Sequence, residues 1–227
     1  MSNSTAILLF SRTAWEEAQY KTFVPHKGNV TIAAELIKHT QQTAISSGLD
    51  VLVPPFQKGI TFGERITHAI GYVFQQGYER VIVIGNDTPM LTKQHILTAH
   101  HLLQEKNMVI GPSTDGGIYL LGIHKTCFQS NTFKQLDWQS ASLFASLQSY
   151  QHHFAYEATL LETLGDIDRL QDFQLILPLL KTSAVHLYFV LINWLYPQNP
   201  PLNILNIACP LFYLPTAKSL RAPPIAA

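Results

Sequence analysis

The stretch Arg80-Val-Ile-Val-Ile-Gly-Asn-Asp-Thr-Pro-Met-Leu91 decides the fold class of this 227-residue chain. Its apolar run is short and continuous, which is typical of a strand that is covered on both faces. Gly85 and Pro89 then predict a turn, and the segment 92–105 predicts a helix with Thr92 as its N-cap. A buried strand followed by a turn and a helix is the repeating unit of a parallel sheet.

The same alternation of strands and helices extends in both directions from this stretch. Apolar runs predict further strands at 6–10, 51–53, 108–111 and 118–123, whereas helical spacing predicts helices at 30–47, 62–77, 140–150 and 169–180. The alternation indicates right-handed βαβ units and a mostly parallel sheet. We therefore expect an α/β domain over residues 1–181.

The segment 182–227 differs from the rest in composition. It holds only two charged residues, Lys218 and Arg221, and seven of the 13 prolines. Its apolar run, 184–196, is shorter than the roughly 20 residues that span a membrane. We expect an apolar, Pro-rich extension that begins with a helix packed on the domain. The alternatives are a membrane-associating segment, an oligomerising segment that would give a homodimer, and a tail that does not fold with the rest.

Charge and cysteine content exclude several classes of protein. With 15 basic and 15 acidic residues, the formal net charge is zero and only 13% of residues are charged, against about 25% in soluble proteins. The chain therefore lacks the positive electrostatic field on which general nucleic-acid binding depends. Cys127 and Cys209 suggest neither a disulfide framework nor a zinc site, and residues 1–10 do not support a secretory signal. A cytoplasmic location is expected.

Asp87 is the first candidate site residue. It follows the strongest predicted strand, and ligands of open α/β sheets bind at the carboxyl ends of strands. A carboxylate there suits a hard cation, Mg²⁺ or Mn²⁺, that bridges to a diphosphate. The alternative is an ordinary turn or helix-capping aspartate.

Two further acidic loops strengthen this interpretation. In Gly111-Pro-Ser-Thr-Asp-Gly-Gly117, Asp115 could hydrogen-bond a sugar hydroxyl while Gly116 and Gly117 let a substrate lie against the backbone, although a simple hairpin turn has the same pattern. In 165–172, Asp166 and Asp168 point the same way if the segment is extended. They could complete a cation site, or Asp168 could be a helix N-cap.

Other motifs are weaker. Arg65, in Gln57-Lys-Gly-Ile-Thr-Phe-Gly-Glu-Arg-Ile66, could reach a phosphate or pair with an acidic loop, or it could form a surface pair with Glu64. Trp138 is more typical of packing, but it could stack on a base or a sugar. No GxGxxG, GxxxxGK[ST] or GxSxG motif is present. The sequence therefore gives no support for a dinucleotide-dependent dehydrogenase, a P-loop enzyme or a serine hydrolase.

Taken together, GNDTPML, GPSTDGGIYLLGI, QKGITFGERI, LDWQS and GDIDRLQDF resemble an uncharacterised glycosyltransferase-A-like family of bacterial nucleotide-diphospho-sugar transferase homologues. The family is related in fold to the molybdenum-cofactor and phospholactate guanylyltransferases, and the resemblance spans roughly residues 6–181. It implies a three-layer α/β/α sandwich, Asp87 as the metal-binding aspartate and Asp168 as a second ligand. It also implies that Asp115, Gly116 and Gly117 line the acceptor or sugar pocket.

The loop after the first strand departs from that family. A Pro-Gly pair and an arginine are usual there, but this chain has Glu16-Glu17 and Phe23. Arg12 and Lys21 remain as candidate phosphate contacts. Two carboxylates in this loop would repel phosphates unless a cation intervenes.

The leading hypothesis is therefore a transferase that uses a nucleotide or nucleotide-sugar donor for glycosyl or nucleotidyl transfer to a small-molecule acceptor. A divalent cation held by Asp87 and Asp168 would neutralise the diphosphate. Arg12, Lys21 and Arg65 would bind the substrate, and Asp115 would orient the acceptor or act as a base. The alternative is a non-catalytic ligand-binding protein on the same fold, with a degenerate phosphate-binding loop.

Overall fold

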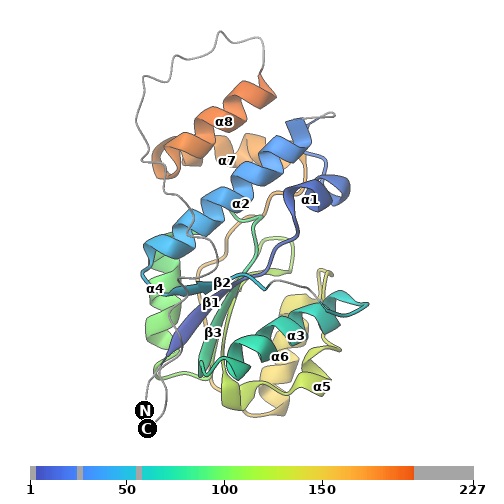
Figure 1. The fold of residues 1–227 in the computed structure, drawn as a ribbon, viewed down its shortest axis with the longest axis vertical. Coiled ribbons are helices and arrows are strands. Elements are labelled where there is room, and N and C mark those ends of the chain that lie inside the picture. Colours follow the sequence, from blue (N-terminus) through green and yellow to red (C-terminus); the bar gives the residue numbers. More distant parts are fainter. Residues whose placement is uncertain (1–3, 25–27, 55–57, 197–227) are drawn as a thin grey trace.

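The computed structural model describes residues 4–24, 28–54 and 58–196. In this part of the chain a six-stranded sheet runs through the centre, in the order β2-β1-β3-β5-β4-β6 (Figure 1). The strands are β1 (Thr5–Leu9), β2 (Asp50–Leu52), β3 (Arg80–Ile84), β4 (Met108–Pro112), β5 (Ile118–His124) and β6 (Ala158–Leu160). Only β5 runs antiparallel to its neighbours, β3 and β4. The expected mostly parallel sheet is confirmed.

Helices cover both faces of the sheet. They are α1 (Ala14–Tyr20), α2 (Gly28–Ser46), α3 (Phe62–Gln75), α4 (Lys93–Leu102), α5 (Ser130–Phe133), α6 (Leu143–His153), α7 (Leu170–Ser183) and α8 (Val185–Leu195), with a 3₁₀ turn at Lys125–Cys127. Thr92 caps α4 as expected, since its side chain accepts from the amide of His95. Thr61 caps α3 in the same way, through a capping box with Glu64.

Alternation along the strands divides the core into two layers. Ala6 and Leu8 face α3, α5 and α6, whereas Ile7 and Leu9 face α2 and α4. Figure 1 shows these two sets of helices on opposite sides of the sheet. The expected three-layer α/β/α sandwich is therefore confirmed.

A third apolar cluster joins α2 to α7 and α8. Phe173, Leu180 and Leu191 are fully buried in it, and the ring of Trp194 lies against Gly28, where a Cβ would come within 2.6 Å of the ring. The first part of the predicted extension thus packs as a helix on α2 and α7 (Figure 1). The remainder, 197–227, lies outside the described residues.

Two features of the sheet differ from the simple βαβ expectation. β4 and β5 form a hairpin whose turn holds Asp115, with a register shift at Gly111/Pro112. β6 pairs with β4 at one edge and was not expected, because its three residues, Ala158–Leu160, are too short to stand out. In the part of the chain that the structure describes, no helix combines the length and apolarity needed to cross a bilayer.

Candidate functional site

A cavity of about 420 Å³ opens at the carboxyl ends of β1 and β3. The β4–β5 turn, the loop 138–141 and the segment 166–168 close its other sides. Five strands of the sheet point toward this end, and the loops that follow them supply its polar side chains. The three acidic loops of the sequence analysis therefore meet in one place.

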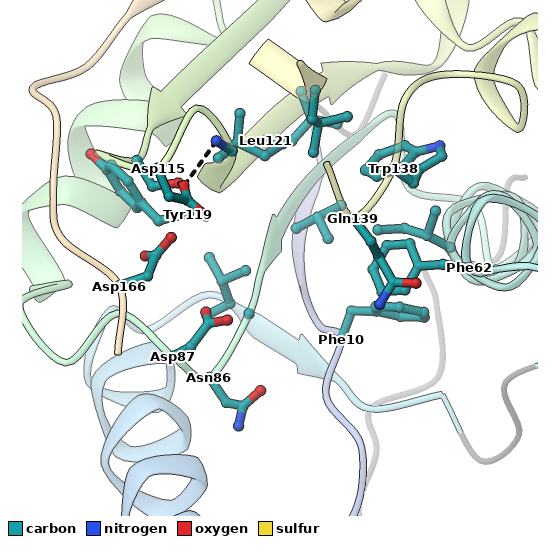
Figure 2. A pocket seen from close by; sticks show the side chains of 18 of the residues that line it. Phe10, Phe62, Asn86, Asp87, Asp115, Tyr119, Leu121, Trp138, Gln139 and Asp166 are labelled. Atoms are coloured by element: carbon teal, nitrogen blue, oxygen red, sulfur yellow. Dashed lines mark hydrogen bonds between the residues drawn. The ribbon is translucent and has the colours of Figure 1, made fainter. Parts of the chain in front are cut away.

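One side of the cavity, which we call the aromatic wall, consists of Phe10, Phe62 and Trp138 (Figure 2). Phe10 and Phe62 meet edge to face at 5.4 Å between ring centroids, and Phe62 lies 5.7 Å from Trp138. The indole N–H of Trp138 donates to the carbonyl of Phe133 at 2.9 Å. Because these rings continue into the core below α3, the wall is fixed by packing.

The opposite side, the acidic wall, consists of Asp87, Asp115 and Asp166 (Figure 2). Asp115 accepts hydrogen bonds from the Ser113 hydroxyl at 2.7 Å and the Gly117 amide at 2.9 Å. Asp166 accepts from the hydroxyl of Thr88. Burial, together with the charges of Asp87 and Asp115, raises the pKa of Asp166 to about 7.

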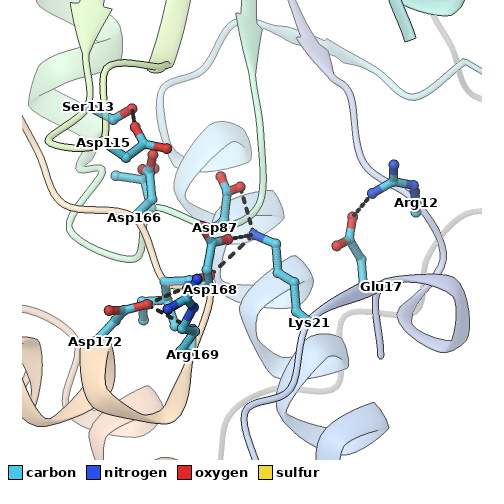
Figure 3. Close-up of polar contacts among 12 residues, drawn as sticks. Arg12, Glu17, Lys21, Asp87, Ser113, Asp115, Asp166, Asp168, Arg169 and Asp172 are labelled. Carbon is cyan, nitrogen blue, oxygen red and sulfur yellow. Dashed lines mark hydrogen bonds and ion pairs between the residues drawn. The ribbon is translucent and has the colours of Figure 1, made fainter. Parts of the chain in front are cut away.

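Lys21 joins two of the predicted site residues. Its Nζ lies 2.8 Å from Oδ2 of Asp87 and 2.8 Å from Oδ1 of Asp168, and it also donates to the carbonyl of Ile167 at 3.2 Å (Figure 3). Burial lowers the pKa of this ammonium, but the two carboxylates more than offset burial, so the pKa lies well above its ordinary value. Lys21 is therefore protonated at any physiological pH.

The segment that carries Lys21 is held from behind by Asn29, at the start of α2. The Asn29 amide donates to the carbonyls of Ala18 and Lys21, at 2.8 and 2.6 Å, and its oxygen accepts from the amide of Phe23 at 2.7 Å. These three bonds fix the end of α1. The position of the Lys21 side chain thus depends on a buried amide that the sequence alone did not indicate.

Glu17 and Arg12 stand beside Lys21 (Figure 3). Glu17 is only 5% exposed, and one of its carboxylate oxygens, Oε2, has no hydrogen-bond partner in the part of the chain that the structure describes. Its other oxygen lies 3.9 Å from Nη1 of Arg12, whose guanidinium stacks over the ring of Tyr20 at 4.1 Å. Of the two glutamates that depart from the family pattern, Glu17 therefore faces the cavity, whereas Glu16 completes the capping box of α1 with Thr13.

A second, more open cavity adjoins the first and shares Arg12, Lys21, Gln139 and Asp168 with it. We call it the side basin. It is lined by Arg12, Tyr20, Lys21, Thr22, Gln139, Asp168, Arg169, Leu170 and Gln171. Three of these side chains are cationic and one is a carboxylate, so the side basin is basic whereas the acidic wall is acidic.

Two predicted site residues, Gly116 and Arg65, line neither of these cavities. Gly116 does not line either cavity; its φ of +90° and the carbonyl of Ala141, 2.2 Å from where a Cβ would stand, explain the glycine by packing of the turn. Gly117 does line the first cavity. Arg65 lines neither cavity; it donates to the carbonyl of Ile60 at 3.0 Å and lies over Phe62. Asp168 is not an N-cap, because α7 is capped at Arg169.

The carboxylates of the cavity are candidate ligands for Mg²⁺ or Mn²⁺. Among the described residues, no three or more His, Cys, Asp or Glu side chains are grouped so that they could hold a metal unaided. Asp87 and Asp168, however, converge on one point, since both contact the same ammonium nitrogen. Mg²⁺ is usually held by one or two carboxylates, completed by waters and substrate phosphates. The pair fits a cation that arrives with a phosphate ligand.

The structure also adds residues that the sequence predictions omitted. Asp166 was noted beside Asp168 but not selected, and Glu17 was read only as a departure from the family. Phe10 ends one predicted strand and Phe62 begins one predicted helix, and the sequence does not distinguish an aromatic residue of the core from one that lines a cavity. A Thr-x-x-Glu capping box at Thr13 and Glu16 was the available signal for α1.

Comparison with solved structures defines the class of fold. The chain is similar to a candidate nucleotide-diphospho-sugar transferase from Desulfovibrio desulfuricans G20, with a TM-score of 0.75 and 22% identity, over 87% of this chain and 98% of that one. This likeness shows the fold, which is of the glycosyltransferase-A type. A hypothetical transferase from Thermus thermophilus (TM-score 0.48, 16% identity, 75% and 99% covered) is more distant. So is Rv0371c of Mycobacterium tuberculosis H37Rv in complex with manganese (0.46, 13%, 80% and 100%).

The family follows from the sequence match. Residues 18–140 match the family described as uncharacterized protein conserved in bacteria (DUF2064). Because the match covers more than half of the chain, the protein belongs to this family. No significant match to a curated protein was found.

Proposed function

We propose that the protein is a transferase that uses a nucleotide-activated donor, either a nucleotide sugar or a nucleoside triphosphate. The observation that carries the proposal is the single cavity that sets the aromatic wall against the acidic wall, with Lys21 and Arg12 between them. A nucleotide has the same division into a flat apolar base and a charged phosphate chain. The similarity in fold to the Desulfovibrio protein supports the same class of activity.

The base of the donor would lie on the aromatic wall. Base–aromatic stacking contributes roughly 1–3 kcal/mol per base and requires an accessible ring face. Trp138 and Phe62 line the cavity, and their rings are held by neighbours rather than by the ligand. This gives Trp138 the stacking role that the sequence left as its second interpretation.

The phosphates would lie between the two cavities. Arg12 and Lys21 border both of them, and Arg169 lies in the side basin. A guanidinium binds phosphate with two parallel hydrogen bonds, which gives direction as well as charge. Arg65 has no part in this arrangement, because its guanidinium is engaged at Ile60.

Asp87 and Asp168 would hold a divalent cation, Mg²⁺ or Mn²⁺, together with donor phosphate oxygens. Such a cation, when bound, neutralises the charge that develops on the departing diphosphate. Without it, four aspartates and a glutamate would face a polyanion with only Arg12 and Lys21 to compensate. The acidic wall therefore favours a donor that binds as its complex with the divalent cation.

The acceptor would bind between Asp115 and Asp166. Asp115 already accepts two hydrogen bonds, which hold its carboxylate in place for orienting an acceptor hydroxyl. Asp166 has a pKa near the working pH, as a general base requires. We assign the orienting role to Asp115 and the proton-accepting role to Asp166. Residues 1–181 then carry the whole site, and 182–227 form an extension.

Isothermal titration calorimetry with a panel of nucleotides and nucleotide sugars, with and without Mn²⁺, tests the proposal. We expect at least one ligand to bind with Mn²⁺ and to lose at least tenfold in affinity in Asp87→Asn. No heat from any ligand would contradict the proposal. Tight binding without turnover of the bound donor, assayed with a mixture of sugar, polyol and phosphorylated acceptors, would support the non-catalytic ligand-binding protein instead.

A further inference from the structure

The ammonium of Lys21 occupies the point on which the Asp87 and Asp168 carboxylates converge. Both N–O distances are 2.8 Å, and the side chain is 15% exposed. A divalent cation between the same two carboxylates would meet this positive charge at contact distance, where like charges repel strongly. Cation binding at this pair therefore requires Lys21 to move.

Glu17 offers the side chain a second partner. Glu17 lines the same cavity. Its Oε2 is buried and has no hydrogen-bond partner among the described residues. A buried carboxylate oxygen without a partner is costly, and burial accordingly raises the pKa of Glu17, with the charge of Lys21 as the largest opposing influence. The salt bridge of Glu17 to Arg12, at 3.9 Å, is too long for a hydrogen bond.

Glu17 and Lys21 are also close along the chain, because Lys21 is the C-cap of the helix that carries Glu17. The amide of Lys21 donates to the carbonyl of Glu17 at 2.9 Å, so the two residues lie one helical turn apart at the end of α1. A glutamate four residues before a lysine is the favourable orientation for an ion pair on a helix. Figure 3 shows the ammonium of Lys21 turned toward Asp87 and the Glu17 carboxylate turned toward Arg12.

We propose that Lys21 has two positions, bridging Asp87 and Asp168 in the free protein and pairing with Glu17 when a divalent cation binds between those aspartates. The inference rests on the cation site of the proposed function and adds to it how that site is occupied before the ligand arrives. Glu17 is then a positioning residue, which acts through Lys21. This role would also explain why the loop after the first strand carries a glutamate at position 17, where the family usually has part of a Pro-Gly pair.

The test is a double-mutant cycle on Mn²⁺ binding to the full-length protein, with the metal alone as ligand. Calorimetry, or electron paramagnetic resonance of free Mn²⁺ where affinity is low, gives the dissociation constants of the native protein, Lys21→Met, Glu17→Gln and the double variant. We expect Lys21→Met to bind Mn²⁺ at least tenfold more tightly, because the competing ammonium is gone. Glu17→Gln should bind about fivefold more weakly, because the displaced ammonium loses its partner.

The decisive comparison is between Lys21→Met and the double variant. We expect Glu17→Gln to leave the Mn²⁺ dissociation constant unchanged once Lys21 is methionine. An equal effect in both backgrounds would overturn the inference, and so would Lys21→Met binding Mn²⁺ no more tightly than the native protein. If Lys21→Met does not fold, Lys21→Arg serves in its place; it keeps the charge with a longer group and should weaken Mn²⁺ binding, and tighter binding would contradict the inference.

A site control and a separate outcome for the proposed function complete the design. Asp168→Asn in the Lys21→Met background should abolish the gain, and a gain that persists would place the ion elsewhere and overturn the inference. Because no nucleotide is present, the cycle can succeed while the nucleotide panel fails. That result would retain the lysine exchange and reject the transferase.

Discussion

The aromatic wall and the acidic wall of the cavity are stabilised in opposite ways. Phe10 is buried in the core, and Phe62 and Trp138 are partly buried against it, so folding and ligand binding favour the same arrangement of these rings. Asp87, Asp115 and Asp166 repel one another, and folding brings them together against that repulsion. One wall is maintained by packing, and the other persists because it has partners. Removing a ring from the aromatic wall should therefore weaken packing, whereas removing a charge from the acidic wall should relieve repulsion in the folded protein.

The largest effect should come from Asp87→Asn. The amide cannot hold a cation or pair with Lys21, so transfer should fall about 10³-fold, or about 4 kcal/mol in the activation barrier. The measurement is initial rate with the donor identified by the nucleotide panel. Asp50→Asn is the matched control, because the Asp50 carboxylate accepts a hydrogen bond from the Tyr78 hydroxyl at the opposite end of the sheet; a similar loss there would point to general destabilisation.

Gly116→Ala tests the turn that supports the acidic wall. The Cβ would meet the carbonyl of Ala141 at 2.2 Å, and φ of +90° adds backbone strain, so we expect about 3 kcal/mol of lost stability in urea unfolding. Gly48→Ala shares a positive φ, +80°, but has nothing within 4 Å. It should cost only about 1 kcal/mol. Equal losses would show that strain alone, and not the contact, fixes the turn.

Asp166→Asn should stabilise the folded protein at neutral and higher pH. The folded pKa, about 7, lies above the ordinary value of 3.8, so the folded state binds the proton more tightly than the unfolded state. The native protein should therefore lose stability as pH rises from 4 to 7. After discounting for partial exposure, we expect a loss on the order of 2 kcal/mol. Urea unfolding across this range should show that the asparagine variant lacks this loss; parallel curves would contradict the shift.

Trp138→Leu probes the aromatic wall and should have the smallest effect. Leucine keeps apolar volume against Phe133 but removes the stacking face, so nucleotide affinity should fall roughly tenfold. Trp15→Leu is the control, since Trp15 is 65% exposed and lines neither cavity. Calorimetry compares the two. If both variants bind like the native protein, the base does not lie on this wall.

Most of the fold was accessible from the sequence because buried strands such as Arg80–Ile84 are continuous apolar runs. The positions of Asp87 and Asp115 followed from the same runs, because they come directly after the ends of strands. The partnership of Lys21 with Asp168 could not be predicted, because it depends on how α1 and the segment before α7 meet in space. The contact of Arg65 with the carbonyl of Ile60 could not be predicted for a related reason: the sequence indicates its helix but not the direction of its guanidinium.

The bond between Lys21 and the carbonyl of Ile167 joins residues 146 positions apart. During synthesis, which proceeds at roughly 5–20 residues per second, Lys21 and Asp87 leave the ribosome several seconds before Asp168. A nascent chain can therefore form the first strands of the sheet, but it has only one carboxylate of the cation pair. The carboxylate pair of the proposed cation site is thus completed late, when the chain beyond the sheet has folded back onto α1.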